Sequence, residues 1–374
     1  MKILVINIVG TLVGCRTLSA LHRCGFDVDL FGYGDSIFHA SDHVANSYKV
    51  EVTGKVTLKE LVGKLVTVIS QSSPDFLVCQ DSAAFQIVRL IAWGNHNLST
   101  TRPEIVRLAR KSIGGEFFCD SELLRRQLPV LLERAGLQAV PQYSATEIGD
   151  EEYHEFARAN DFNLLLKLEG RQNGQGIFRI QSEAELAAAV RQHCPDPGGG
   201  GFTLQRHVDG PVLRHSLVAL NGTALAQFTA EQIRTRFDEP FQAPTVVRLV
   251  SDRDIGEQAS SLVRTCGLSG FLGMDFIRDK RTARSYLIDI NPRINSLSHL
   301  GVIAGLDLSA SLYDGLSGRE TDGDQPEYSP GTYGTVFPYE WLRDRNSPYL
   351  LSAASDTPWD DVGLLRRILA SLKM

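Results

Sequence analysis

Two alternating apolar runs in the last third of the chain, separated by a short polar turn, constrain its fold more than any other feature. Residues 272–278 and 286–291 alternate apolar and polar side chains, and residues 279–284 between them have the composition of a turn. This pattern predicts an antiparallel hairpin. The pairing would place Asp275 opposite or nearly opposite Asp289, so that two carboxylates meet on neighbouring strands.

Polar side chains continue past the second run, in the sequence D-I-N-P-R. Because side chains two apart in a strand share a face, Asp289, Asn291 and Arg293 should point one way, while Ile288 and Ile290 point into the core. Like charges across a sheet repel each other unless a cation lies between them. Magnesium prefers oxygen ligands and completes its shell with waters and phosphates. The hairpin therefore predicts a magnesium site, and a solvated face with ordinary salt bridges is the alternative.

An acidic residue on one strand followed by D-I-N-P-R on the next resembles the metal motif of the ATP-grasp superfamily. The resemblance covers roughly residues 1–310. It implies an α/β protein with an ATP-grasp fold, in which two α+β subdomains grip ATP, preceded by a parallel-sheet domain like that of biotin carboxylase and carbamoyl-phosphate synthetase. It also implies that Asp275, Asp289 and Asn291 bind Mg²⁺ or Mn²⁺, and that Arg293 contacts the reacting phosphate or carboxylate. Asp289 stands where glutamate is commoner.

A lysine interrupts the apolar run at residues 164–168 and precedes the glycine-rich segment E-G-R-Q-N-G-Q-G. A strand lysine usually keeps its ammonium in water at a sheet edge, which is the alternative here. A lysine followed by a glycine loop resembles the superfamily's pairing of a phosphate ligand with a mobile lid. By that resemblance Lys167 binds the α and β phosphates, and the loop with Gly174 and Gly176 closes over them.

A helix expected at residues 121–135, ended by Gly136, resembles the segment that supplies a first basic phosphate ligand in the superfamily. Counting back from Gly136 places Arg125 at that position, with Arg126 as the alternative ligand. An exposed helix arginine without a role is the competing interpretation.

Residues 203–210, T-L-Q-R-H-V-D-G, resemble the strand and hinge that bind adenine in the superfamily. By that resemblance Gln205, Arg206, His207 and Val208 belong to the nucleotide site, and backbone groups near His207 and Val208 read the base edge. Gln205 replaces the usual glutamate, and Val212 stands where a ribose-binding glutamate is common. Adenine recognition through backbone atoms survives both changes, whereas the ribose contact and the nucleotide preference stay open.

Arginines alternate in the segment between the hinge and the hairpin, at Arg234 and Arg236. Side chains at this spacing would share one strand face and bind the substrate carboxylate or the γ-phosphate. A solvated strand is the competing interpretation. Arg214, two residues beyond Val212, is a further candidate for the lining of the site.

The first hundred residues alternate short apolar strands with helical stretches. Strands are expected at residues 3–8, 28–31 and 76–79, and helices near 15–24, 57–70 and 82–92. This order predicts an α/β unit with a mainly parallel sheet. Lys2 and the apolar run that ends at Gly14-Cys15 also have features of a lipoprotein signal. We favour a buried first strand, because cleavage at Cys15 would remove the founding strand of the unit.

Changes in composition along the chain predict three segments. Residues 1–115 are expected to form the parallel-sheet domain. Residues 116–312 form the ATP-grasp domain, with a lid subdomain at about 140–205. Residues 313–374 form a C-terminal extension that packs on the core and closes with an amphipathic helix near 362–372.

The composition limits the partners and the compartment. A formal net charge of −6 over 374 residues argues against a general nucleic-acid or anionic-membrane surface, because an excess of Lys and Arg holds such partners. No run approaches the roughly 18 apolar residues of a membrane span. The six cysteines form no C-x-x-C pair, which fits neither a disulfide framework nor a zinc knuckle and favours the cytoplasm. Symmetric dimers are the commonest oligomers, so a homodimer is expected.

Other signatures of nucleotide binding and of nucleophilic catalysis are absent from the sequence, which has no G-x-x-x-x-G-K-[ST] loop and no G-x-G-x-x-G after a strand. The resemblance implies an ATP- and magnesium-dependent carbon–nitrogen ligase. Such an enzyme activates a small-molecule carboxylate as an acyl phosphate, joins it to an amine and releases ADP and phosphate. Three alternatives stay open: carboxylation or carbamoyl-phosphate-type chemistry, simple phosphoryl transfer, and a non-catalytic ATP-binding regulator.

Overall fold

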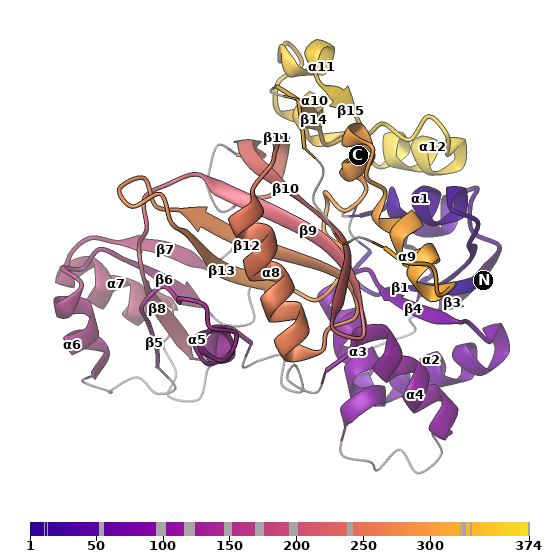
Figure 1. Cartoon of the computed structure of the whole chain (residues 1–374), viewed down its shortest axis with the longest axis horizontal. Helices are drawn as coiled ribbons and strands as arrows, with labels where there is room; N and C mark the ends of the chain where they lie inside the picture. The colour runs from indigo at the N-terminus through magenta and orange to yellow at the C-terminus, as the bar shows by residue number, and fades with distance from the viewer. Residues whose placement is uncertain are drawn as a thin grey trace.

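The computed structural model describes residues 1–10, 12, 14–51, 56–94, 102–115, 124–145, 152–168, 176–193, 201–237, 242–321, 323, 327–329 and 331–372. In these ranges the strands form three sheets. Figure 1 shows a central sheet between the N-terminal unit at one end and a smaller unit, built from residues 142–206, at the other. None of the helices in the described ranges combines the length and the apolar composition needed to cross a bilayer.

The N-terminal unit is a parallel sheet covered by helices. Its elements are β1 (Lys2–Asn7), α1 (Thr17–Arg23), β2 (Asp27–Tyr33), η1 (Ile37–Ala40), β3 (Asn46–Val50), α2 (Leu58–Ser72), β4 (Phe76–Cys79), α3 (Ser82–Trp93) and α4 (Pro103–Ile113). The order β3-β2-β1-β4 puts β1 inside the sheet, and every strand pair is parallel. The predicted α/β unit is confirmed, because β1 is buried by helices on both faces, as a parallel sheet requires.

Three elements of this unit were not predicted: the short 3-10 helix η1, strand β3 and helix α4. β3 has the sequence N-S-Y-K-V at the sheet edge, where most of its side chains are exposed and no apolar alternation marks it. α4 has Pro103 in its first turn, where the missing N–H costs nothing, and it buries Ile105, Ala109 and Ile113. An edge strand is held mainly by backbone hydrogen bonds to its neighbour, so its side chains carry little signal.

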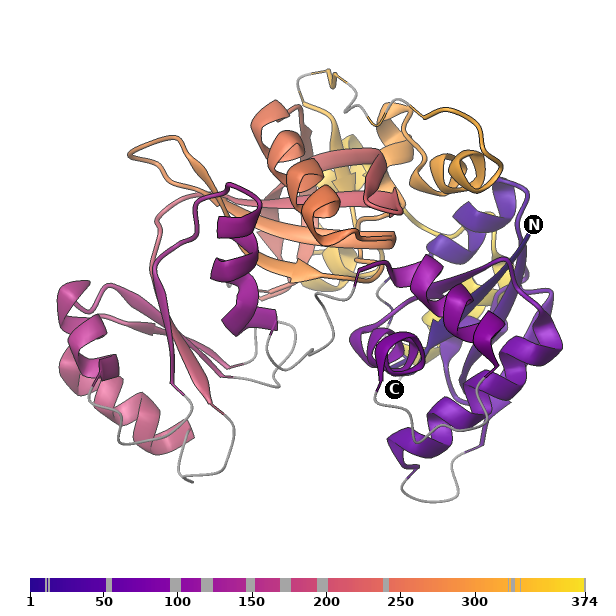
Figure 2. The same cartoon turned by 60° about the horizontal axis from the view of Figure 1, so that its bottom comes forward.

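The second unit is a four-stranded antiparallel sheet with two helices on one face (Figure 2). It contains β5 (Gln142–Ala145), α6 (Glu152–Ala159), β6 (Leu164–Leu168), β7 (Ile177–Ile180), α7 (Glu183–His193) and β8 (Phe202–Arg206). The helix before it, α5 (Leu124–Arg134), packs on α8 and β13 of the central unit instead. The strand order is β5-β8-β6-β7. Leucines of β6 and β8 pack with Tyr153 of α6 and Leu186 of α7 in a core of their own. We call the sheet with α6 and α7 the lid unit.

The central sheet has the order β13-β12-β9-β10-β11-β14-β15. Its elements are β9 (Val212–Leu220), β10 (Thr223–Thr235), β11 (Pro244–Val250), α8 (Arg253–Cys266), β12 (Gly270–Arg278), β13 (Ser285–Asn291), η3 (Leu300–Ala304), α9 (Leu308–Leu316), β14 (Tyr333–Thr335), α10 (Tyr339–Arg343), α11 (Tyr349–Ser352), β15 (Ala354–Ser355) and α12 (Val362–Ser371). The last two strands of the sheet therefore come from the C-terminal extension.

The closing helix α12 docks on the N-terminal unit, as Figure 1 shows. Asp361 is fully buried and caps this helix through the N–H of Leu364 at 3.0 Å. Its carboxylate also accepts the hydroxyl of Ser41 at 2.5 Å and the N–H of Asp42 at 3.0 Å. One side chain thus ends the loop before the helix and joins the last segment of the chain to the first.

Candidate functional site

The hairpin of β12 and β13 carries the two carboxylates that the sequence singled out. The strands pair antiparallel, and Asp275 lies directly opposite Asp289, as predicted. Their side chains share the face that also carries Asn291, while Met274 and Ile290 are buried on the other face. The hairpin thus presents paired acidic groups on one polar surface beside a closed core.

The predicted orientation of Ile288 was wrong. The register shifts after Asp275, so that Phe276 pairs with Leu287 and Ile288 is the extra residue of a bulge. Leu287 takes the core position instead, and Ile288 packs with Val208 of the hinge segment. The bulge therefore places an apolar side chain on the same side of the hairpin as the carboxylates.

The electrostatics of the pair follow from its partial burial. Burial raises the pKa of Asp275, the guanidinium of Arg214 opposes this, and the charge of Asp289 raises the pKa further. Asp289 accepts one hydrogen bond, from the N–H of Ile290 at 3.1 Å. Within the described ranges no three His, Cys, Asp or Glu side chains form a metal-binding group. The donor set here is two carboxylates, which suits a hard cation whose other ligands are water or phosphate.

Arg214 completes a row of charges across three strands. It lies on β9 opposite Asp275 and forms an ion pair with that carboxylate. Its guanidinium also donates to Oε1 of Gln232 at 2.9 and 3.3 Å. The sequence suggested only that this arginine lines the site. The row Asp289, Asp275, Arg214 is set by strand register, which the sequence does not display for non-consecutive strands.

Arg293 joins the hairpin to the N-terminal unit. Its Nε donates to the hydroxyl of Ser82 at 3.0 Å, and its Nη2 donates to Oδ1 of Asn291 at 3.1 Å. Burial lowers the pKa of Arg293, while the carboxylates of Asp289, Asp81 and Asp275 oppose this effect. The amide oxygen of Asn291 therefore already has one donor, and its second lone pair is the one left for a cation beside the carboxylates.

Asp81 was not predicted as part of the site. It caps α3 through the N–H of Ala84 at 2.8 Å and binds the N–H groups of Ile8 and Val9 at 2.7 and 2.9 Å. It thereby fixes the segment after β1 beside the end of β4, at the carboxyl edge of the parallel sheet, where ligands of open α/β sheets bind. An aspartate directly before a helix and after a buried strand was the available signal.

The predicted phosphate ligands lie in the lid unit and in the helix α5 that precedes it. Lys167 lies on β6 and is only 7% exposed, between Thr203 of β8 and Ile177 of β7. Gly176 opens β7 with a φ of +86°, a conformation that glycine adopts without strain. Gly174 and the rest of the predicted lid loop lie outside the described residues. Arg125 lies in α5, and its side chain also lies outside them.

The predicted hinge connects the lid unit to the central sheet. Gln205 donates to Oε1 of Gln142 at 3.1 Å, and the N–H of His207 donates to the carbonyl of Asn163 at 2.8 Å. The N–H of Arg206 donates to the carbonyl of Pro141 at 2.9 Å. These donors therefore already have partners within the chain.

After these residues the hinge packs on the hairpin. Val208 is buried with Val140 and Tyr286, and Ile288 lies against this group. A Cβ at Gly210 would overlap the carbonyl oxygen of Arg278, so only glycine allows this close approach. An apolar surface thus lies between the hinge and the carboxylate face.

Arg234 lies near the end of β10, where the pairing with β11 shifts register twice, and Arg236 follows directly after this strand. The shifts break the alternation that the sequence suggested. Arg234 pairs with Glu340 of the C-terminal extension at 3.2 Å and stacks on Tyr349. The guanidinium of Arg236 lies 5.1 Å from the ring centre of Tyr339. The two arginines therefore meet the extension, and Arg234 has a buried carboxylate as its partner.

Comparisons of the fold give several similar solved structures. The biotin carboxylase domain of Hydrogenobacter thermophilus 2-oxoglutarate carboxylase matches with a TM-score of 0.62 and 17% identity, over 89% of this chain and 73% of that one. N5-carboxyaminoimidazole synthetase of Staphylococcus aureus matches with a TM-score of 0.62 and 15% identity, over 87% and 78%. L-amino acid ligase of Bacillus licheniformis matches with a TM-score of 0.58 and 15% identity, over 87% and 77%. No family model and no curated protein sequence matches the chain.

Proposed function

We propose that this chain, which has the ATP-grasp fold, is an ATP- and magnesium-dependent ligase that joins a carboxylate to an amine. The observation that carries the proposal is the direct pairing of Asp275 with Asp289 on one face of the hairpin, with Arg293 beside them. Like charges in this arrangement repel each other, and a bound divalent cation removes that cost.

Asp275 and Asp289 would hold the magnesium ion, and the amide oxygen of Asn291 would join them through its second lone pair. When bound, magnesium neutralises the triphosphate charge that otherwise repels an incoming carboxylate. Manganese has the same ligand preference and is the expected substitute. The shorter side chain of Asp289, in place of glutamate, leaves the acidic group on the same face.

The nucleotide would lie between the lid unit and the central sheet. Lys167, with Arg125 of α5, would bind phosphate oxygens, and Gly174 and Gly176 belong to the loop that covers them. The base would rest on the apolar surface of Val208 and Ile288, with the hinge backbone at its edge. The structures of the Hydrogenobacter and Staphylococcus proteins were determined with ADP, the former with magnesium as well, and this supports a nucleotide in the shared fold.

In the proposed reaction a carboxylate oxygen of the acid attacks the γ-phosphorus of ATP, and the bond to the β,γ-bridging oxygen breaks to give an acyl phosphate and ADP. The amine then attacks the acyl carbon, phosphate leaves and the amine loses a proton. Arg293 would bind the negative oxygens of the substrate carboxylate and of the acyl phosphate. Arg236 would add positive charge, while Arg234, paired with Glu340, would hold the extension over the site.

Two other reactions use the same arrangement. Carboxylation replaces the acid with bicarbonate, and the bicarbonate in the Hydrogenobacter biotin carboxylase structure motivates this second candidate. Phosphoryl transfer would stop at a phosphorylated product. A nucleotide-binding regulator without turnover is the fourth candidate, because Gln205 and Val212 depart from the common pattern.

The direct test is a screen of acid and amine pairs for ADP release, with hydroxylamine added to trap an acyl phosphate. A ligase gives an amide product with the amine and a hydroxamate with hydroxylamine. Bicarbonate-dependent ADP release without either product would favour carboxylation instead. A chain that binds ATP and releases no ADP with any acid would disprove the ligase proposal.

Nucleotide binding is tested separately by thermal unfolding. MgATP should raise the melting temperature, and ATP with a chelator should raise it much less. Without the metal ion, the negative triphosphate and the carboxylates of Asp275 and Asp289 repel each other. Lys167→Ala should weaken ATP binding with little effect on the unliganded protein's fold. Equal stabilisation by ATP with and without magnesium would contradict the assignment of Asp275 and Asp289.

A further inference from the structure

Arg214 belongs to the polar face of the hairpin, and the proposed function gives it no role. It lies on β9 in register with Asp275 of β12, and Asp275 in turn lies opposite Asp289 of β13. Neighbouring strands are about 4.8 Å apart, so the guanidinium and the two carboxylates follow one another across the sheet. Asp275 therefore has a positive group on one side and a negative group on the other.

The guanidinium of Arg214 occupies one oxygen of Asp275. Its Nη1 donates to Oδ2 of that carboxylate, and the two side chains are only 17% and 16% exposed. Water screens such a pair less than it screens a pair on the surface. A cation that approaches Asp275 therefore competes with a positive charge that already neutralises this carboxylate.

The position of the guanidinium is fixed by its other donors. Nε and Nη2 both donate to Oε1 of Gln232 on β10, at 3.3 and 2.9 Å. Nη2 also donates to the carbonyl oxygen of Gln242 at 3.4 Å. Every nitrogen of the guanidinium thus has an acceptor, and a movement away from Asp275 would require these donors to find new partners.

Few other oxygens of the polar face are available to a cation. Oδ1 of Asp289 accepts the N–H of Ile290, and Oδ1 of Asn291 accepts a hydrogen bond from Arg293, both at 3.1 Å. Within the described ranges, Oδ1 of Asp275 and Oδ2 of Asp289 accept no hydrogen bond. These two oxygens and the second lone pair of Asn291 leave the rest of an octahedral magnesium shell to water or phosphate.

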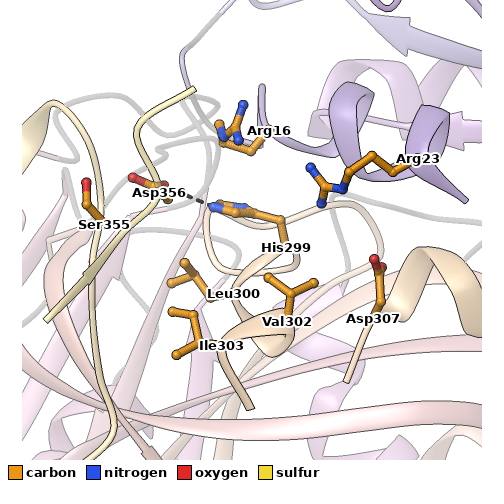
Figure 3. Close-up of a pocket in the computed structure, with 9 residues that line it drawn as sticks. All are labelled: Arg16, Arg23, His299, Leu300, Val302, Ile303, Asp307, Ser355 and Asp356. Atoms are coloured by element: carbon orange, nitrogen blue, oxygen red, sulfur yellow. Dashed lines mark hydrogen bonds and ion pairs between the residues drawn. The ribbon is translucent and has the colours of Figure 1, made fainter. Parts of the chain in front are cut away.

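Two other neighbouring arginines lie away from this face. Arg16 and Arg23 line a cavity of about 370 Å³ beside the C-terminal extension (Figure 3). Both pair with Asp360, at 2.7 and 2.9 Å. No residue of the hairpin lines this cavity, so its charges do not act directly on the carboxylate pair.

Arg248 offers a comparison on the same sheet. It lies on β11 opposite Glu231 of β10 and forms an ion pair with it, so this pair also joins neighbouring strands. Glu231 is in register with Leu213, which precedes Arg214 on β9 and therefore points to the opposite face. The pair of Arg248 and Glu231 thus resembles that of Arg214 and Asp275 but lies away from the polar face.

We propose that Arg214 keeps the metal site closed to a free divalent cation, so that the ion binds tightly only together with the triphosphate of the nucleotide. This role rests on the proposed function, which places the metal on Asp275 and Asp289. Without nucleotide, Arg214 offsets the charge of Asp275 and repels another cation. The phosphates supply the oxygen ligands that Arg214 withholds, and their negative charge outweighs its positive charge. Arg214 is thus a positioning residue that acts through Asp275.

Binding of Mn²⁺ to the full chain without nucleotide tests this role, with free Mn²⁺ measured by electron paramagnetic resonance. Arg214→Gln removes the charge and should lower the Kd for Mn²⁺ about tenfold or more. Arg214→Lys keeps a positive charge beside Asp275 and should stay close to the unmodified chain. A purely structural role predicts the opposite change, because loss of a structural ion pair would disorder the site and weaken metal binding.

Gln232→Glu tests the same step with Arg214 retained, which covers the case that Arg214→Gln does not fold. The new carboxylate competes with Asp275 for the guanidinium, so the Kd for Mn²⁺ should again fall, by about threefold or more. Arg248→Gln is the matched control. It breaks an ion pair between neighbouring strands and changes the net charge by the same amount, and it should leave the Kd for Mn²⁺ unchanged.

A further measurement separates this role from the proposed function. The Mn²⁺ complex of a non-hydrolysable ATP analogue should bind to the unmodified chain. Failure of that complex to bind would contradict the metal site, and the role of Arg214 would be overturned with it. If the complex binds but neither Arg214→Gln nor Gln232→Glu lowers the Kd for free Mn²⁺, the role of Arg214 alone is overturned.

Discussion

In the proposed function, the side chains of Asp275 and Asp289 hold the metal ion. They face each other across a strand pair, and only Asp275 has an ion-pair partner in the described residues, Arg214. Burial makes the pair costly in the absence of a cation, since it raises the pKa of Asp275. A divalent cation bound between the two carboxylates would remove this electrostatic cost, which is why we propose the metal site here.

Asp289→Asn should separate stability from function. It removes the repulsion between the carboxylates, so the free energy of unfolding of the unliganded protein should stay the same or rise by up to about 1 kcal/mol. The rise in melting temperature with MgATP should be lost, and turnover should fall by about 100-fold or more. Thermal unfolding with and without MgATP measures both effects. Asp254→Asn, on an exposed face of α8, is the control, and a retained MgATP response in Asp289→Asn would contradict the metal assignment.

His215 is a fully buried histidine that the proposed chemistry does not use. Its Nε2 lies 3.1 Å from Oε1 of Gln227 and its Nδ1 lies 3.0 Å from the hydroxyl of Thr229, so the neutral ring satisfies both. Burial lowers its pKa to about 4. The unfolded chain, with an ordinary histidine pKa near 6.5, therefore binds more protons than the folded chain between these values.

Stability should consequently fall as the pH is lowered from about 6.5 toward about 4, by up to about 3 kcal/mol from this residue. His215→Gln should reduce that dependence although it lowers stability overall. Urea unfolding at a series of pH values measures the slope. His22→Gln, at an exposed histidine, should keep the slope of the unmodified chain, and an equal slope in His215→Gln would show that another group is responsible.

At the scale of the elements, the bulge in β13 brings the hinge segment into contact with the carboxylate side of the hairpin. The shifted register sends Leu287 into the core and leaves Ile288 against Val208 of the hinge. The alternation of apolar residues predicted the strand but not its bulge. One extra residue reverses which face of the sheet the side chains beyond it occupy. The apolar surface beside the carboxylates was therefore missed.

The attachment of α12 gives an element-scale prediction. Asp361→Ala removes the cap of this helix and the bonds to Ser41 and Asp42, all in a buried place. The free energy of unfolding should fall by about 2–4 kcal/mol, because buried donors lose their acceptor as well as the cap. Thr57→Ala removes an exposed cap of α2 and should cost about 1 kcal/mol. Chemical denaturation compares them, and equal losses would mean that Asp361 acts only as a cap.

At the scale of the molecule, the C-terminal extension joins the central sheet to the N-terminal unit. It adds β14 and β15 to the central sheet, docks α12 on the N-terminal unit and supplies Glu340 to Arg234. Figures 1 and 2 show the lid unit at the far end, joined to the rest through the hinge. In the proposed function, movement of the lid unit about this hinge would admit the nucleotide.

Substitutions of Arg234 and of Arg236 should have different effects. Arg234→Ala removes the closer of the two ion-pair partners of Glu340, which is 1% exposed, and leaves Arg343 at 3.9 Å, so the free energy of unfolding should fall by about 2 kcal/mol. Arg236→Ala removes a ring contact and should cost about 1 kcal/mol or less, while lowering turnover if it binds substrate anions. Denaturation and ADP release measure the pair. A stable Arg234→Ala with lost turnover would restore Arg234 as an anion ligand.

The local elements and the hairpin can be predicted from the amino-acid sequence alone. Strand β1, strand β4, the helices between them and the pairing of Asp275 with Asp289 follow from apolar periodicity and from a turn, which act over short stretches of chain. The domain boundaries and the roles of the site residues remain predictions. Exposed edge strands such as β3 were not predicted, since an exposed strand carries no apolar alternation.

Contacts between segments far apart in the chain depend on the tertiary fold and could not be predicted from the sequence. The row of Asp289, Asp275 and Arg214, the contact of Arg293 with Ser82 and the pairing of Arg234 with Glu340 all join residues far apart in the chain. Their positions depend on sheet order and on bulges, which the packing of the whole core selects. A sequence shows which side chains carry charge, whereas the packed fold decides which of those charges remain available to a ligand.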